Sequence, residues 1–439
     1  MVSTVEKTVE HDLCVSCGIC KAVCPVGCID MKFSQGQFLP MIDKTKCTEC
    51  LKCRRVCPGF EVDFEMLYSY ESRDLPEDIL TGDVLESYIV HTKDKKIREE
   101  ATSGGVITTL LVNLIEKGLY DKVFVVKFEK FKGEEVKAVP TSKVEDIIEA
   151  AKSKYLPVSM EEVITYIQNN PDEKIAVVGT SCHFHGIKKF LLEEYISSEN
   201  ILFLGLFCEK TLNFNLLQFY EDRYAKKDER IINFNYRNKQ DNGWPGNSKI
   251  EFNSRREVFI DRKVRMRVKR YFQLNRCLYC IDKLNQFADI SFGDCYIDGE
   301  ESNLGKSNIL IRTKKGKNIF GQINNLFEFK KVEIDKIFSS QNISKKNDNL
   351  IYDRINNGEN INKLNLKLEQ FEKKKLKKQL QHKKNTIKKG KYYENNKVLI
   401  KKEIKKNNFK LKLKILNKVL IKLLDIIGLK ELVKKVVKY

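Results

Sequence analysis

Eight cysteines in two matching runs near the start of the chain constrain its fold more than any other feature. Residues 14–25 read CVSCGICKAVCP and residues 47–58 read CTECLKCRRVCP, so both follow the spacing C-x2-C-x2-C-x3-C-P. Three thiolates from one tight loop can face three irons of a 4Fe-4S cubane, and the fourth ligand then comes from elsewhere. The repeated spacing therefore predicts two iron–sulfur clusters that exchange their fourth ligands.

The spacing is that of bacterial two-cluster ferredoxins, in which the cysteine before the proline ligates the other cluster. It assigns Cys14, Cys17, Cys20 and Cys57 to one cluster, and Cys47, Cys50, Cys53 and Cys24 to the other. A pair of zinc knuckles, or a set of structural thiols, is the competing interpretation. Cys28 lies outside the pattern and is interpreted as a small apolar residue. Residues 1–65 are thus predicted to form an α+β, ferredoxin-like domain.

The net charge of +20 belongs to one end of the chain. Residues 361–439 hold 26 lysines and 6 acidic residues, so the rest of the chain is neutral. This distribution argues against a nucleic-acid-binding protein. No uninterrupted apolar run reaches ~18 residues, and the first residues do not read as a secretory signal. We therefore expect a cytoplasmic protein in which clustered cysteines bind metal or carry redox chemistry.

Between residues 82 and 345 the pattern changes to alternating strands and helices. Strands are predicted at 84–92, 122–129, 174–180, 201–208 and 308–313, and segments with helical period lie between them. This alternation predicts an α/β domain with a mostly parallel sheet, in which ligands bind outside the carboxyl ends of the strands.

One motif in this domain, ATSGGVITTLL at 101–111, begins a helix that Thr102 or Ser103 can cap. Gly104 and Gly105 each cost roughly 1 kcal/mol relative to alanine in a first helical turn. A ligand that approaches the backbone closely would explain them, and the free N–H groups of a helix start favour phosphate. An ordinary cap is the alternative interpretation. A G-x-G-x-x-G fingerprint is missing, so no NAD site of the Rossmann type is predicted.

Four further cysteines lie at strand ends or in a loop of this domain: Cys182, Cys208, Cys277 and Cys280. Four thiols suffice for a third 4Fe-4S cluster, and equally for a structural zinc site. Cys182 could instead be a nucleophile activated by the helix start and His183, or bind a metal together with His183 and His185. His185 is interpreted as a structural residue, and Cys295 is left over.

The domain resembles the family of coenzyme F420 hydrogenase and dehydrogenase beta subunits; F420 is a deazaflavin hydride carrier. The matching motifs occur in family order: ATSGGVITTLL, SKYLP (153–157), VGTSC, GLFC, YRNKQDNGWPG (236–246), CLYC (277–280), ADISFGD (288–294) and SNILIRTKKG (307–316). The resemblance extends to members with a fused two-cluster ferredoxin, and it covers roughly residues 10–345.

The resemblance implies an FAD-binding domain with a 4Fe-4S cluster beside the flavin, ligated by the four body cysteines. By position it implies that Thr102, Ser103, Gly104 and Gly105 hold the phosphates or the ring edge of the flavin, and that the flavin pocket is lined by Lys154, Tyr155, Gly179 and Thr180. It also implies that Asp289, Gly293 and Asp294 lie near the cluster or the flavin. Two departures flank the predicted reaction site. Relatives commonly have proline and glutamine where this chain has Ser181 and His183, and many have an aromatic residue where it has Cys295.

The predicted protein is an oxidoreductase that depends on flavin and iron–sulfur clusters. Electrons are expected to pass between reduced deazaflavin or a similar carrier, FAD, the body cluster, the ferredoxin clusters and a redox protein partner, such as a ferredoxin or another oxidoreductase subunit. His183 is predicted to donate a proton near the flavin. The alternatives are a non-catalytic electron-transfer subunit, a reductase of another substrate and a zinc-stabilised binding protein.

Residues 346–439 are predicted to form a basic, helical C-terminal tail. Lys and Asn dominate residues 345–407, which predicts a solvated helix or a disordered linker. From residue 409, apolar residues at helical spacing alternate with lysines. Such a face suits an anionic membrane surface, here the inner face of the membrane, or the groove of an acidic partner. A helix that packs on its own domain is the alternative.

Overall fold

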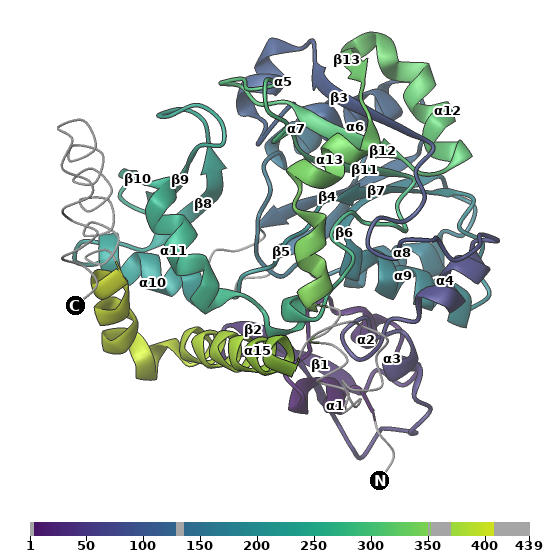
Figure 1. Cartoon of the computed structure of the whole chain (residues 1–439). Helices are drawn as coiled ribbons and strands as arrows, with labels where there is room; N and C mark the ends of the chain where they lie inside the picture. Colours follow the sequence, from purple (N-terminus) through teal and green to yellow (C-terminus); the bar gives the residue numbers. More distant parts are fainter. Residues whose placement is uncertain (1–3, 129–135, 350–351, 353–369, 408–439) are drawn as a thin grey trace, which may run out of the picture.

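The computed structural model describes residues 4–128, 136–349, 352 and 370–407, with side chains from 375 onward in the last stretch. Three parts pack together in Figure 1: an N-terminal module at the bottom, a body built on a large sheet above it, and a small sheet with its helices at the left. The described N-terminal and central stretches include every cysteine of the chain.

The N-terminal module contains a hairpin and three short helices: α1 (Glu6–Glu10), α2 (Ile19–Ala22), β1 (Ile29–Ser34), β2 (Gln37–Ile42) and α3 (Lys52–Arg55). The two cysteine runs take the same backbone path. Ser16 and Gly18 in the first run and Glu49 and Leu51 in the second all have positive φ, between 54° and 70°. This repetition shows that the matched spacing builds two equivalent loops, within the α+β fold that the sequence predicts.

The body is an eight-stranded sheet in the order β13-β3-β12-β11-β7-β6-β4-β5. Its strands are β3 (Glu86–Thr92), β4 (Lys122–Phe128), β5 (Val136–Thr141), β6 (Ile175–Thr180), β7 (Ile201–Leu206), β11 (Ile290–Asp294), β12 (Ser307–Ile311) and β13 (Phe327–Lys331). The central strands β4, β6, β7 and β11 are parallel, whereas the outer pairs are antiparallel. The predicted mostly parallel sheet is thus a mixed sheet with a parallel centre.

Two hydrophobic cores cover the two faces of this sheet, because alternate residues of a strand point to opposite faces. Ala176 and Leu202 join one core, with α6 (Val106–Glu116), α7 (Val144–Glu149) and α12 (Lys314–Ile323). Val177 and Phe203, the next residues along, join the other core, with α8 (Glu161–Asn169) and α9 (Ser181–Glu193). Burial on both faces explains why these strands read as continuous apolar runs.

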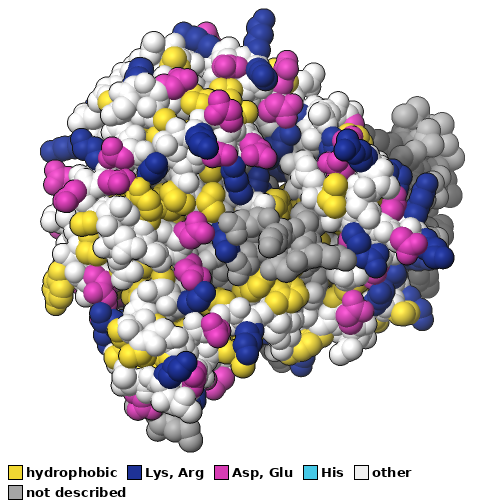
Figure 2. All heavy atoms as spheres, turned by 180° about the vertical axis from the view of Figure 1, so that it is seen from behind, with side chains coloured by type: hydrophobic (Ala, Val, Ile, Leu, Met, Phe, Trp, Pro, Cys, Tyr) yellow, Lys and Arg dark blue, Asp and Glu magenta, His cyan; other side chains and the backbone are white. Residues whose placement is uncertain are grey.

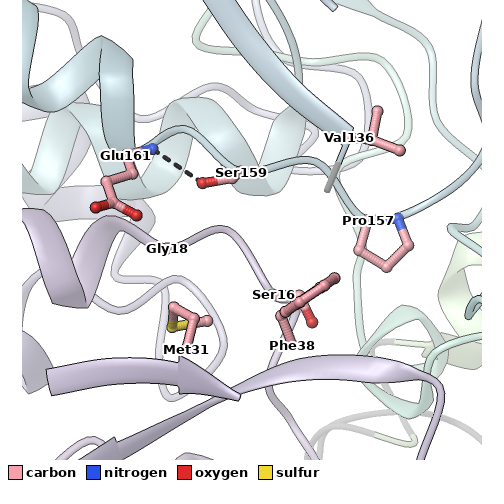
Figure 3. Close-up of a pocket in the computed structure, with 8 residues that line it drawn as sticks. All are labelled: Ser16, Gly18, Met31, Phe38, Val136, Pro157, Ser159 and Glu161. Carbon is pink, nitrogen blue, oxygen red and sulfur yellow. Dashed lines mark hydrogen bonds between the residues drawn. The ribbon is translucent and has the colours of Figure 1, made fainter. Parts of the chain in front are cut away.

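The second core continues into the N-terminal module, so the two parts share one apolar interior. Val15, Ile19 and Val56 of the module pack with residues of α8 and α9. Figure 3 shows a small crevice at this junction, with Met31 and Phe38 of the hairpin on one side and Val136 and Pro157 of the body on the other. The module is therefore fixed against the body.

A small antiparallel sheet, which the sequence did not predict, follows β7. It consists of β8 (Ile231–Asn238), β9 (Asn247–Phe252) and β10 (Glu257–Ile260), flanked by α10 (Asn215–Tyr224) and α11 (Arg262–Phe272). The remaining described elements are α4 (Phe64–Tyr70), α5 (Lys95–Glu100), α13 (Ile334–Ser340), α15 (Gln370–Lys391) and the short 3-10 helices η1 (Asn275–Leu278), η2 (Asn324–Leu326) and η3 (Ile343–Lys345).

The basic tail is helical over α15, as predicted, but this helix is packed on the protein and not fully solvated. In Figure 1, α15 runs between the small sheet and the N-terminal module. Leu380 and Ile387 are buried against Leu278 and Tyr279 of the body, with Leu13 of the module beside them. Because α15 is rich in lysine, its composition did not indicate this apolar stripe. The predicted membrane- or partner-binding helix from residue 409 lies outside the described residues.

The surface in Figure 2 carries Lys and Arg side chains interspersed with Asp and Glu. A mixed surface of this kind agrees with the neutral charge of the chain before its basic tail. In the described part of the chain, no helix is both long and apolar enough to span a membrane.

Candidate redox site

The first thiol group of the N-terminal module comprises Cys14, Cys17, Cys20 and Cys57. Burial raises the pKa of Cys14 to about 12 and that of Cys17 and Cys20 well above the usual value, and nearby thiols raise them further. The charge of Cys57 acts on the other three. Thiols crowded in a buried site become thiolates when a metal supplies positive charge. The structure thus brings together the set that the spacing predicts.

The second group of the module surrounds a hollow lined by Cys24, Cys47, Cys50 and Cys53. Cys50 is exposed, so this group reaches the surface. Cys28 also lines the hollow, and its Sγ lies 3.4 Å from that of Cys24. Cys28 is buried, but its thiol faces a ligand set, so it is not simply a small apolar residue.

The four body thiols come together at the carboxyl edge of the sheet. Cys182 begins α9 directly after β6, and Cys208 follows the neighbouring strand β7. Cys277 and Cys280 come from the loop that contains η1. Burial raises the pKa of Cys182 to about 12, and the charges of Cys277 and Cys280 raise it further. Cys208 is affected by the other three thiols, so all four form one group.

A buried hydrogen-bond network ties the loop of Cys277 and Cys280 to the sheet. The Cys208 N–H donates to Lys283 O at 2.8 Å, and Ser181 Oγ donates to Asp282 O at 2.7 Å. His185 Nε2 lies 2.9 Å from an Asp282 carboxylate oxygen, and both side chains are buried. These contacts give His185 the structural role that the sequence predicts.

His183 has a different environment from the one expected of a proton donor. Its Nδ1 accepts the Thr180 N–H at 3.2 Å and completes a capping box at the start of α9. Burial lowers the pKa of His183 to about 4, so its ring is neutral at neutral pH. A neutral imidazole is a weak acid. The structure therefore favours a capping role over the predicted donor role.

A polar cluster lies at the end of β11, beside the loops of the small sheet. Arg237 is buried and forms an ion pair with Asp294, with one contact of 3.0 Å from its second terminal nitrogen. Burial alone would raise the pKa of Asp294, but Arg237 holds it below the usual range. Trp244 Nε1 donates to Asp294 at 3.3 Å, and Tyr155 stacks on Tyr236 with ring centres 4.0 Å apart.

The loop of the ATSGG motif borders this cluster. Ser103 Oγ donates to Lys306 O at 2.7 Å, and Lys239 donates to Ser103 O at 3.1 Å. Gly105 adopts φ +76°, which a residue with a side chain rarely adopts, and a Cβ on Gly104 would lie 2.7 Å from Val90 O. The predicted helix cap is therefore a tight glycine turn held against β3 and β12.

The SKYLP segment lies against the same loop. The Ser153 N–H donates to Thr102 Oγ1 at 3.0 Å, and Tyr155 has φ +59°, an unusual value for a tyrosine. Lys154 donates to the carbonyls of Ala150 and Ala151, and burial lowers its pKa to about 8. Strained backbone of this kind often accompanies a binding site.

Three other predicted residues make packing or backbone contacts within the sheet and its helices. Asp289 precedes β11 at the opposite end from Asp294, where it accepts from the Phe203 N–H and from Thr313. Gly179 and Gly293 have packing roles, because a Cβ at Gly179 would lie 2.6 Å from Phe184 and one at Gly293 would lie 1.9 Å from Phe207. Both glycines therefore permit close packing, although Gly179 and Thr180 also adjoin the Cys182 thiol.

Sequence reasoning did not single out Arg237, Lys239, Trp244 and Tyr236 as site residues. All four lie in the segment YRNKQDNGWPG, where two cations and two aromatic residues occur in a glycine- and asparagine-rich stretch. That composition was the available signal, since polar loops with cations and aromatic residues often bind ligands.

The residues present fit an anionic, aromatic cofactor such as a flavin dinucleotide. Arg98 Nε is buried without a hydrogen-bond partner among the described residues. Burial lowers the pKa of Lys239 to about 8, so an added anion would stabilise its ammonium. Two cations and a glycine turn suit a diphosphate, and the Tyr155–Tyr236 stack suits a ring.

Four thiols in a group suit a four-iron cluster, whose ligands surround a hollow as those of the second module group do.

These features define an iron–sulfur protein of the electron-transfer class, with a ferredoxin-type module fused to an α/β domain. Residues 13–59 match the 4Fe-4S dicluster domain. Residues 87–165 and 172–336 match the N-terminal and C-terminal parts of the coenzyme F420 hydrogenase/dehydrogenase beta subunit. The chain belongs to the family of these beta subunits and is an oxidoreductase component.

Two curated relatives and one solved structure illustrate the similarity. A component of the F420H2 dehydrogenase of Methanosarcina mazei is 24% identical over 348 residues, 75% of this chain and 87% of the relative. Coenzyme F420-dependent sulfite reductase of Methanocaldococcus jannaschii is 25% identical over 326 residues, 71% of this chain but only 46% of that relative. A chain of the F420-reducing [NiFe] hydrogenase complex of Methanosarcina barkeri, solved with xenon, is 22% identical, with a TM-score of 0.48 over 66% of this chain and 98% of that chain.

Proposed function

We propose that this chain transfers electrons between a reduced deazaflavin, or a similar two-electron carrier, and a redox protein partner, by way of FAD and three 4Fe-4S clusters. The observation that carries the proposal is a shared hydrophobic core. Tyr236 of the polar cluster, Cys182 and Cys277 of the body and Cys17 of the first module group all lie in or against this core, whereas Cys24, Cys47 and Cys53 of the second module group belong to another core.

Two contacts support a direct route from the body thiols to the module. The charges of Cys17 and Cys182 act on each other, so the first module group adjoins the body group. The Met160 N–H also donates to Cys17 O at 2.8 Å, which fixes this loop on the body. The exposed Cys50 places the second module group at the far, solvent-facing end, where a protein partner can dock.

The residues of the chain hold and separate these groups. The twelve predicted cysteines are the proposed cluster ligands, and Arg98, Lys239 and the glycine turn are the proposed contacts to the phosphates of FAD. A bound flavin exchanges two electrons as hydride and passes them on singly, which clusters accept one at a time. Lys154 and the Tyr155–Tyr236 stack would line the flavin ring pocket.

The decisive test is anaerobic purification followed by assays of iron, sulfide and flavin, and then by a donor screen. We expect about twelve irons per chain, because three cubanes require four each, and one FAD. Reduced F420, NADH and NADPH are then compared as donors by bleaching of the cluster absorbance. Rapid bleaching by reduced F420 alone supports the proposal.

The same assays distinguish the other candidate functions. Twelve irons without flavin and without reduction by any soluble donor would indicate a non-catalytic electron-transfer subunit. Bound FAD with reduction by another donor would indicate a different substrate, as the similarity to a sulfite reductase allows. A colourless protein that holds zinc would contradict the whole scheme.

A further inference from the structure

The segment that follows the family-matched region returns to the loop of Cys277 and Cys280. The match ends at residue 336, within α13. Ile337 and Ile343 then pack with Leu284 and Leu310 in a core beside the sheet. This packing fixes the direction of the chain after η3, so Lys346 and Asn349 lie against the loop of the body thiols.

Two side chains of this segment bind the backbone of the thiol loop. Asn349 Nδ2 donates to Cys277 O at 3.2 Å and to Cys280 O at 2.8 Å. Lys346 Nζ donates to Cys280 O at 3.3 Å. Together they satisfy the carbonyls of both cysteines, so the ligand loop is held from outside the family-matched region.

Lys346 is a buried cation beside the loop of Cys277 and Cys280. Its exposed fraction is 3%. Among the described residues it forms no ion pair with a carboxylate within 4 Å; Glu209, on which its charge also acts, pairs with Lys283 instead. Its Nζ lies 3.3 Å from Cys280 O, so its charge is held beside the thiol loop. Burying a cation is costly unless an opposite charge compensates it.

We propose that Lys346 is a positioning residue that raises the reduction potential of the body cluster. The inference rests on the proposed function, because it requires a 4Fe-4S cluster on the four body thiols. Such a cluster with four thiolates is anionic, and it becomes more negative by one charge when it accepts an electron. A nearby buried ammonium stabilises the reduced state more than the oxidised state, and cluster potentials depend on net charge, hydrogen bonds and exposure.

This role has a consequence for the direction of electron flow. A higher potential at the body cluster favours electron acceptance from a flavin and disfavours further passage to the ferredoxin-type clusters. Lys346 would therefore determine how far the body cluster is reduced before a partner takes electrons from the module.

The test compares three variants of the full chain, each purified anaerobically. Lys346→Met removes the charge and the donor, Lys346→Gln removes the charge but keeps an N–H donor, and Lys346→Arg keeps the charge. Lys345→Met is the matched control, because the adjacent lysine is exposed. The body-cluster signal is identified as the electron paramagnetic resonance signal that is absent in Cys277→Ser, and its potential is measured by redox titration.

We expect Lys346→Gln and Lys346→Met to lower the equilibrium constant for reduction of that cluster about tenfold, which is 59 mV for one electron. Lys346→Arg should restore the wild-type potential, and Lys345→Met should leave it unchanged because solvent screens exposed charges. If Lys346→Met loses the four irons of the body cluster, Lys346→Gln still measures the effect of charge alone.

An unchanged potential in Lys346→Gln with full iron content would overturn the inference, as would an equal shift in Lys345→Met. A wild-type protein with about eight irons and no signal lost in Cys277→Ser would instead refute the body cluster, and with it the proposed function. The iron count therefore separates failure of the proposed function from failure of the role of Lys346.

Discussion

The thiol sites of the N-terminal module and of the body differ in how far apart their members lie in the sequence. In the module, three thiols of each site fall within seven residues, and the matching φ values of Ser16 and Glu49 show that the loop alone sets their positions. In the body, Cys182 and Cys208 meet because β6 and β7 end side by side, and Cys277 joins them from the distant loop that contains η1. Local spacing builds the first kind of site, whereas the complete sheet builds the second.

The strongest test of this comparison removes one thiol from each kind of site. Cys277→Ser and Cys53→Ser should each lower the iron content by about four, because a cubane that lacks a thiolate ligand is readily lost. Each variant should lose a different electron paramagnetic resonance signal. Cys295→Ser, at a cysteine outside all three groups, is the control and should keep every iron. Full iron content in Cys277→Ser would show that the body thiols hold no cluster, so the body could not be compared with the module as a second kind of site.

The ion pair between Arg237 and Asp294 joins distant parts of the chain, so breaking it should be costly. Arg237→Met leaves a buried carboxylate unpaired, and we expect a loss of about 3–5 kcal/mol in the free energy of unfolding, measured by anaerobic urea denaturation. The exposed, local pair of Lys46 and Asp43 is the comparison, and Lys46→Met should leave the free energy of unfolding nearly unchanged.

The pH dependence of the same variant provides a second measurement. Arg237 holds the pKa of Asp294 below its unfolded value, so the pair stabilises the fold above about pH 4 and is lost as pH falls through the folded pKa. Without Arg237, burial raises that pKa instead. Acidification from pH 7 toward pH 5 should therefore reduce the stability deficit of Arg237→Met relative to wild type; a constant deficit would show that Asp294 stays charged.

The contact between α15 and α11 is a smaller test of long-range assembly. A Cβ on Gly390 would lie 1.9 Å from Tyr271 O, a backbone atom that cannot move freely. We expect Gly390→Ala to destabilise the protein by about 1–3 kcal/mol, measured by urea denaturation. Gly321, in α12, has open space around it. Gly321→Ala should stabilise by up to about 1 kcal/mol through helix propensity, and equal effects of the two changes would argue against the observed packing.

The smallest predicted change concerns Lys154, a local residue of the proposed flavin pocket. Its pKa of about 8 means that burial of the ammonium destabilises the fold fully below pH 8, and this penalty disappears as pH rises toward the unfolded value of about 10.4. Lys154→Met loses two hydrogen bonds but also the penalty, so a net gain of about 1 kcal/mol is expected at pH 7.

The pH series and the flavin content provide the checks on Lys154. The gain in stability of Lys154→Met should shrink as pH rises from 7 to 10, which urea denaturation at each pH would measure. The flavin content after gel filtration should fall, because the pocket loses a cation. A gain that grows with pH would contradict the burial of a charged Lys154.

Sequence reasoning succeeded where local rules suffice. Each predicted strand, such as 122–129 and 174–180, appears within one or two residues of its expected bounds, because strands buried on both faces read as apolar runs. The thiol spacing of the module was similarly informative, since three ligands and their backbone conformation lie in one loop.

The features that the sequence did not predict depend on contacts between residues far apart in the chain. The partnership of Arg237 with Asp294 spans 57 positions and follows from the placement of the small sheet, which has no strong local signal. In α15, long lysine side chains outnumber the apolar residues, so the sequence does not reveal that Leu380 and Ile387 pack against Leu278 and Tyr279. The roles of His183 and Asp289 also changed because hydrogen bonds to Thr180 and Phe203 have no signature in the sequence.

Helix α9 begins at Ser181, next to the Cys182 thiol, and one turn further Gly186 lets it approach the module so closely that a Cβ there would lie 2.6 Å from Ile19. Lys189, another turn away, donates to Cys57 O at 3.1 Å. Seven residues of helix span about 10 Å. Because α9 is a continuous helix, it fixes the distance between Cys182 and the part of the module that contains Cys57. In the proposed function, the module group of Cys14, Cys17, Cys20 and Cys57 would be a fixed relay that needs no diffusive encounter. Only the group that reaches the surface at Cys50 would meet partners, at a rate that their concentration controls.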